Sequence, residues 1–185
     1  MSSLRNSYNR IVRNNKDFLS FAEYAERLGI LYNMVDIRTV AGSSSNYLSV
    51  LTPDFPNGAS GLLGRSMNAY EQGGLRYRIW LGATDIVYNA SPNPTIVTSG
   101  GQALWRRVDS VTLTGATQVD EIWIPESDAQ GNRNIGAFEE IEEIKRQPNN
   151  TEIVIEIENT ETGPVDFNLK LVYIEDPEGL IIRPL

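Results

Sequence analysis

Residues 151–173, which read TEIVIEIENTETGPVDFNLKLVY, decide the fold. Ile153, Ile155 and Ile157 recur at every second position, and Glu156 and Glu158 fall on the opposite face. This period of two is typical of a strand with one buried face. Residues 165–173 show the same alternation after a turn-rich stretch. We therefore predict that the two segments pair as a β-hairpin.

Short strand-like segments recur outward from this pair. In the segment 75–81, alternate apolar residues share one face. Further candidate strands are residues 34–40, 47–51, 85–88, 95–98, 103–108, 110–114, 119–124 and 180–182. The segments after residue 74 give about seven to nine short strands with no helices alternating between them, which is typical of a sandwich. The sequence predicts a mainly-β protein, with an antiparallel β-sandwich of jelly-roll or Greek-key type over residues 75–185.

Residues 1–74 are predicted to form an N-terminal arm, one short α-helix and an extended Gly/Pro-rich loop. The helix spans residues 17–28, where Phe18, Phe21 and Leu28 fall on one apolar stripe and Gly29 is a helix stop. The dense prolines and glycines of residues 53–74 predict the loop.

The first sixteen residues carry Arg5, Arg10, Arg13 and Lys16 and no acidic side chain. Their apolar content is too low for the segment to fold alone. It is either a frayed terminus or an arm that becomes ordered against a neighbouring subunit.

The composition excludes several classes of site. The 185 residues include no cysteine and no histidine. Without cysteine there is no disulfide, no thiolate nucleophile and no zinc–thiolate site. Without histidine the chain lacks the usual general base and the commonest transition-metal ligand. We therefore expect a protein that is not an enzyme and needs no cofactor or metal.

The net charge of −8 is unevenly distributed. Residues 1–107 carry 11 Lys/Arg against 7 Asp/Glu, a charge of +4, and residues 108–185 carry 5 against 17, a charge of −12. A net-acidic chain is a poor candidate for nucleic-acid binding. There is no signal-peptide pattern and no long apolar run, so we expect neither secretion nor a membrane span.

Three local patterns suggest chemistry but favour simpler interpretations. The glycine-rich residues 58–66 lack the lysine of a phosphate-binding P-loop. Residues 128–134 contain too few acidic ligands for a calcium loop and have the composition of a turn. Two acidic pairs at residues 139–143 could serve a glycosidase, but flanking Ile141 they are typical of a solvated face.

Tryptophans 80, 105 and 123 all fall in predicted strands. Trp80 lies beside two arginines on the face opposite the apolar one, and Trp105 precedes Arg106. Tryptophan and arginine are enriched where proteins bind one another, although a sheet buried on both faces is the alternative. The candidate interface residues are Arg5, Arg10, Arg13, Phe18, Phe21, Arg76, Arg78, Trp80, Trp105 and Arg106.

In outline, the whole chain resembles virion proteins of tailed bacteriophages, particularly capsid decoration (cement) proteins. The resemblance rests on the basic arm, the short helix, the Gly/Pro-rich stretch and a sandwich free of cysteine and histidine. Residues 151–160 and 165–174 are also similar to the closing hairpins of viral β-sandwiches. The resemblance implies a virion protein, assembled in the host cytoplasm, that binds major capsid subunits. It implies monomers or trimers, of which we favour a homotrimer.

The leading hypothesis is therefore a non-enzymatic capsid decoration protein that stabilises the shell. The alternative is a receptor- or glycan-binding module of a tail fibre or baseplate, which would stack sugars on exposed aromatic rings. A carboxylate hydrolase is the least favoured hypothesis.

Overall fold

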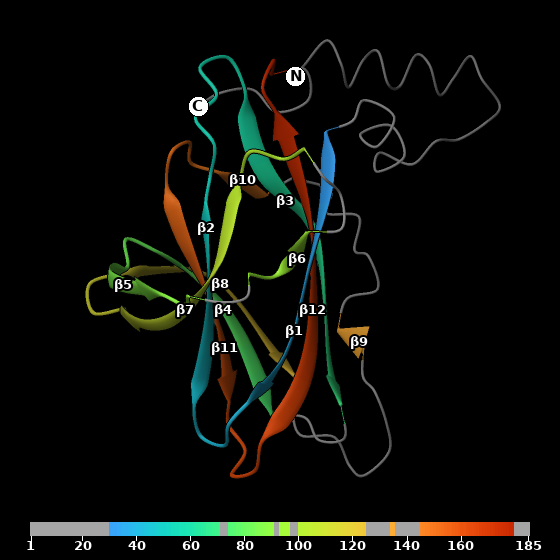
Figure 1. Ribbon diagram of the computed structural model, residues 1–185, viewed down its shortest axis with the longest axis vertical. Helices are drawn as coiled ribbons and strands as arrows, with labels where there is room; N and C mark the ends of the chain where they lie inside the picture. Colours follow the sequence, from blue (N-terminus) through green and yellow to red (C-terminus); the bar gives the residue numbers. More distant parts are fainter. Residues whose placement is uncertain are drawn as a thin grey trace, which may run out of the picture.

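A computed structural model describes residues 30–70, 74–90, 93–96, 100–124, 134–135 and 145–179. In this part the chain forms two antiparallel sheets that face one another (Figure 1). The mainly-β, sandwich-like architecture is thus confirmed, and the predicted helix at residues 17–28 lies outside the described residues. The strands are β1 (Leu31–Val40), β2 (Ser45–Leu51), β3 (Ala59–Tyr70), β4 (Leu75–Leu81), β5 (Thr84–Tyr88), β6 (Thr95–Ile96), β7 (Leu104–Thr112), β8 (Thr117–Ile124), β9 (Asn134–Ile135), β10 (Lys145–Gln147), β11 (Glu152–Asn159) and β12 (Val165–Asp176).

The two sheets have different strand orders. Sheet A has the order β10-β3-β12-β1-β6, with β9 also paired to β3, and sheet B has the order β5-β7-β2-β11-β4-β8. Figure 1 shows β1, β3 and β12 on one side and β2, β7 and β11 on the other. Strands that follow one another along the chain, such as β1, β2, β3 and β4, alternate between the two sheets.

The predicted hairpin between residues 152–158 and 165–173 is wrong. β11 lies between β2 and β4 in sheet B, whereas β12 lies between β1 and β3 in sheet A. A period of two requires only that one face of each strand be buried. Pairing within one sheet and facing across two sheets both satisfy that requirement. The connection at residues 160–164 therefore crosses from one sheet to the other.

Residues 59–70, predicted to be part of a loop, form strand β3 instead. β3 pairs with β12 along its length, with an irregularity between Val172 and Tyr173. Glycine weakens an isolated strand, but pairing with a central strand overrides that local preference. Gly58, just before β3, is required by packing, because a Cβ there would overlap the backbone carbonyl of Asp176.

A single apolar core fills the space between the sheets. The largest fully buried side chains in it include Tyr77 and Phe167. β4, β11 and β12 supply most of its members, as their alternating patterns predict. The core cluster is Met34, Val40, Leu48, Val50, Leu62, Met67, Ala69, Leu75, Tyr77, Ile79, Ile153, Ile155, Ile157, Val165, Phe167, Leu169 and Leu171.

Charged contacts join the sheets on both sides of this core. On one side, Arg65 of β3 pairs with Asp120 of β8, and its guanidinium carbon lies 5.0 Å from the centre of the Tyr77 ring. Burial raises the pKa of the Tyr77 phenol, so this hydroxyl stays neutral. On the other side, Asp36 of β1 pairs with Arg107 of β7.

Glu175 of β12 fastens the chain that leads into β7. Its buried carboxylate accepts hydrogen bonds from the backbone N–H of Gln102 at 2.6 Å and of Ala103 at 2.8 Å. Burial raises the pKa of Glu175, and these two hydrogen bonds oppose the rise. Tyr32, whose own pKa is raised by burial and by this carboxylate, lies nearby.

Because the pKa of Glu175 is raised, we expect the free energy of unfolding to depend on pH. The folded state holds a proton on this carboxyl to higher pH than the unfolded chain, whose pKa is near 4.5. Stability therefore falls as pH rises above about 4.5 through the folded pKa. The variant Glu175→Gln cannot titrate at this position and lacks this fall. In urea unfolding, its free energy of unfolding relative to the wild type should therefore increase between pH 4.5 and 7. An unchanged difference across that range, or the same gain in the exposed control Glu178→Gln, would contradict the prediction.

Candidate interaction surface on sheet B

The outward face of sheet B gathers most of the described charged and aromatic side chains that the sequence singled out. β4 turns Leu75, Tyr77 and Ile79 into the core, so its intervening residues point outward. The register of the flanking strands extends this face across all six strands. We call it the sheet B face. Its buried members are Ser49, Val108, Val154 and Glu156. Its half-buried or exposed members are Tyr47, Arg76, Arg78, Trp80, Tyr88, Arg106, Glu121, Trp123, Glu152 and Glu158.

Glu156, at the centre of the sheet B face, is only 4% exposed. Its carboxylate accepts hydrogen bonds from Ser45 Oγ at 2.8 Å and from Trp80 Nε1 at 2.9 Å. Arg78 Nε lies 3.1 Å away, close enough for an ion pair although not aligned as a hydrogen bond. Burying a carboxylate is costly unless it is hydrogen-bonded and paired in this way. The hydrogen bond from the Trp80 N–H group to Glu156 therefore fixes the orientation of the indole.

A second carboxylate, Glu158, extends the ion pairs toward the edge of the sheet. Arg78 donates to Glu158 at 2.8 Å, and Arg76 lies 3.5 Å from the same oxygen. Arg76 also lies 3.6 Å from Glu121 of the edge strand β8. These outer pairs are more exposed than Glu156, so each contributes little to stability. These ion pairs do hold the guanidinium groups of Arg76 and Arg78 side by side on the sheet.

The third carboxylate of β11, Glu152, joins three other strands. Its Oε1 accepts hydrogen bonds from Ser49 Oγ, from Tyr88 Oη at 2.5 Å and from Arg106 at 3.3 Å. The Arg106 guanidinium carbon lies 3.6 Å from the centre of the Tyr88 ring, a cation–π contact. Burial, followed by the hydrogen bond to Glu152, raises the pKa of Tyr88. This phenol is therefore a hydrogen-bond donor. The hydrogen bonds of Glu152 link β11 to β5 and β7.

The structure brings four of the predicted interface residues together on the sheet B face: Arg76, Arg78, Trp80 and Arg106. Trp105 points the other way, because its register partner Val50 faces the core. Its ring meets that of Tyr173 edge-on, with 5.6 Å between the ring centres. Trp105 is therefore half-buried between the sheets and does not lie on the outward face. The other five candidates, Arg5, Arg10, Arg13, Phe18 and Phe21, lie outside the described residues.

Trp123 is the aromatic residue that sequence reasoning did not select. It lies on β8 opposite Arg76 and is 57% exposed. The sequence signal was the alternation in β8, which turns Ile122 toward the core and leaves Trp123 on the other face. Because Trp80 is held by Glu156, Trp123 is the more available ring for a partner.

The remaining patterns from the sequence are placed as follows. The glycine-rich residues 58–66 lead into and form part of β3, an arrangement with no helix start to bind phosphate. The acidic pairs at residues 139–143 lie outside the described residues, as does most of the turn at 128–134. Among the residues that the structure describes, no group of three or more acidic side chains is placed to hold a metal ion.

Within the same described ranges there is no helix long and apolar enough to cross a membrane. The chain matches no protein-family model and no curated protein sequence.

Proposed function

We propose that this sandwich is of the jelly-roll type. The supporting observation is the strand order, in which β10-β3-β12-β1 of one sheet faces β2-β11-β4-β8 of the other. Successive strands of these eight change sheet except at the step from β4 to β8, where β5, β6 and β7 are inserted. This alternation is the pattern of two interlocked Greek keys, which recurs in viral capsid and lectin domains.

We infer that the protein is a non-enzymatic virion structural protein that binds major capsid subunits as a decoration or cement protein. The observation that supports this most is the composition of the sheet B face. It presents an exposed tryptophan beside arginines that are held in place by glutamates. Aromatic residues and arginine dominate the binding energy of protein interfaces, and rigid side chains lose little entropy on binding.

The carboxylates of this face support a binding role over hydrolysis. Glu152, Glu156 and Glu158 each contact an arginine, and two of them also accept hydroxyl hydrogen bonds. A general acid must be free to reach its substrate, whereas each of these carboxylates is engaged by an arginine. We therefore assign these carboxylates the role of orienting arginines.

The exposure of Trp123 also supports the second candidate, a receptor- or glycan-binding module. A tryptophan that is 57% exposed on an open sheet can stack on a sugar ring. Arg76 and Glu121 lie beside it and could bond sugar hydroxyls. In this case the partner would be a host-surface glycan in place of a capsid subunit.

The two candidates are separated by adding purified protein to particles that lack it. A decoration protein should add cryo-electron density over the joints between major capsid subunits. Trp123→Ala should weaken binding at least about tenfold, measured as occupancy at sub-saturating protein, because an interface tryptophan contributes about 2 kcal/mol or more. The matched control is Leu104→Ala, since Leu104 is similarly exposed but lies on β7, four strands away from β8.

Particles that show no added density with wild-type protein would rule out the capsid role. Loss of adsorption to host cells in Trp123→Ala, with capsid density unchanged, would instead support the glycan-binding module. The free energy of unfolding of both variants should stay within about 0.5 kcal/mol of the wild-type value, because exposed substitutions have little effect on stability.

A further inference from the structure

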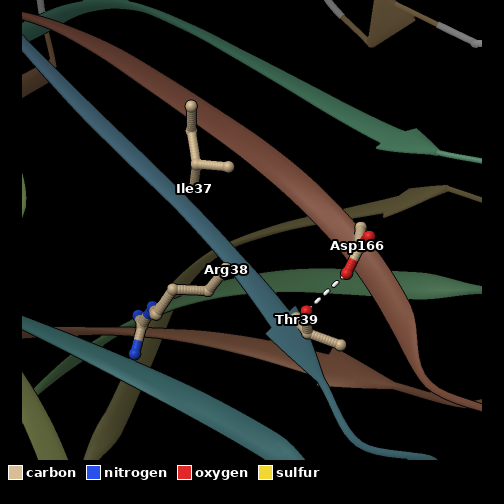
Figure 2. Close-up of a pocket in the computed structure, with 4 residues that line it drawn as sticks. All are labelled: Ile37, Arg38, Thr39 and Asp166. Carbon is tan, nitrogen blue, oxygen red and sulfur yellow. Dashed lines mark hydrogen bonds between the residues drawn. The ribbon is translucent and has the colours of Figure 1, made fainter.

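The outward face of sheet A has an open hollow of about 450 Å³ where β1 and β12 pair. Its lining residues are Ile37, Arg38, Thr39 and Asp166 (Figure 2). The Arg38 side chain runs the other way, toward its ion-pair partner Asp36 between the sheets. The side chains that a ligand would meet in the hollow are therefore Ile37, Thr39 and Asp166.

The chemistry of this hollow is that of an apolar surface beside a carboxylate. Ile37 is 60% exposed, the most exposed of the large hydrophobic side chains in the described part of the chain. Asp166 is exposed and accepts a hydrogen bond from Thr39 Oγ1. No Lys or Arg in the described ranges forms an ion pair with it. An aliphatic stem with a cation at its end, the side chain of arginine or lysine, complements both parts.

We propose that this hollow is the docking site for the basic N-terminal segment of this protein, residues 8–13. This segment reads YNRIVR and belongs to the sixteen residues that carry four cations and no acid. It lies outside the described residues, and 29 residues precede the point at which the described chain begins. That length spans up to about 95 Å when extended, enough to reach the hollow of its own or of a second copy.

The spacing of apolar and basic residues in this segment matches the hollow. Ile37 is opposite Asn168 and Thr39 is opposite Asp166, so Ile37 and Asp166 are diagonal neighbours on one face. Such neighbours are about 7–8 Å apart. In an extended segment, residues two apart lie on the same side and are separated by about 6.6 Å. Ile11 with Arg13, or Tyr8 with Arg10, therefore places an apolar group on Ile37 and a cation on Asp166.

Hydrogen exchange of the full-length protein, read at the amides of residues 8–13, tests this docking. Asp166→Arg should speed exchange there by about threefold or more, since it replaces an attraction with a repulsion. The double variant Arg10→Asp/Arg13→Asp should do the same. Combining all three substitutions restores opposite charges and should slow the exchange again. Exchange within β11, followed in the same samples, reports whether the sandwich is intact.

The matched control is Asp54→Arg, which makes the same charge change at another exposed aspartate. It should leave exchange at residues 8–13 at the wild-type rate. The proposal is overturned if Asp166→Arg has no effect, if Asp54→Arg has an equal effect, or if the combined variant does not recover. The hollow lies on the sheet opposite the sheet B face, so this outcome is independent of the capsid and glycan proposals.

Discussion

Replacing Asp36 by asparagine is expected to lower the free energy of unfolding by about 3–5 kcal/mol. The Asp36 carboxylate is completely buried, between Arg38 of its own strand and Arg107 of the other sheet. The measurement is denaturant unfolding followed by tryptophan fluorescence. A loss below about 1 kcal/mol would contradict the structure of this cluster.

The size of the effect comes from the arginines that would be left behind. Arg107 donates to Asp36 Oδ1 through two nitrogens, at 2.7 and 3.0 Å, and Arg38 lies 2.7 Å from the other carboxylate oxygen. Arg38 also donates to the backbone carbonyl of Tyr47 at 3.1 Å. Burial lowers the pKa of Arg38, and Asp36 opposes that shift. Without Asp36, two largely buried cations would face each other with no counter-charge.

A second substitution separates this explanation from a general loss of packing. Arg107→Met removes one of the two cations and keeps an apolar side chain of similar length. In the wild type it should destabilise, but in the Asp36→Asn background its cost should shrink by at least about 1 kcal/mol, because it removes an unpaired charge. The exposed control Asp54→Asn makes the same chemical change and should stay within about 0.5 kcal/mol of the wild type.

The sequence predicted the strands well and their partners poorly. Alternation identified β1, β2, β4, β11 and β12, because each of these strands has one face against the core. The same alternation cannot say whether two consecutive strands pair or face each other across the core, and β11 and β12 face each other. β3 was missed because its pairing with β12 outweighs the low strand preference of its glycines.

The candidate surface was predictable to the same extent. The outward positions of Arg76, Arg78 and Trp80 follow from the apolar alternation of β4. Trp105 differs because its strand is partnered by β2, and register with Val50 turns the ring inward. The acidic partners of these arginines come from β11 and, for Glu121, from β8, and both pairings depend on long-range register. No local pattern in the sequence contains that information.

One side chain, Asn159 at the end of β11, contacts both turns at this end of the sandwich. Its backbone N–H donates to Ser44 at 2.8 Å, and its Nδ2 group lies 2.8 Å from the carbonyl of Gly163 and 3.2 Å from those of Val40 and Ala41. Its Oδ1 accepts the N–H of Glu161 at 2.8 Å. The backbone N–H of Ser43 also donates to the Glu161 carbonyl at 2.7 Å, and the buried Asn159 amide adds the side-chain contacts that join the β1–β2 turn to the β11–β12 turn.

Asn159→Asp is therefore expected to destabilise the protein by about 2–4 kcal/mol at neutral pH. The substitution keeps the shape and the acceptor for Glu161, but it turns a carboxylate oxygen toward three carbonyl oxygens. The three carbonyls lose their donor, and the unmet carbonyl of Val40, whose contact is buried, costs about 1–3 kcal/mol. Urea unfolding of the variant against the wild type measures the loss.

The pH dependence of this variant identifies the cause. Carbonyl oxygens disfavour the charged form, so the folded pKa of the new carboxyl should lie above its unfolded value near 4. Below its folded pKa the new carboxyl is protonated and can donate to a carbonyl. The loss of unfolding free energy relative to wild type should therefore shrink as pH falls. Asn46→Asp is the matched control, since Asn46 makes one exposed bond of this kind, to Thr39. It should cost under about 1 kcal/mol, and a deficit in Asn159→Asp that does not change with pH would show that packing, not this amide, joins the two turns.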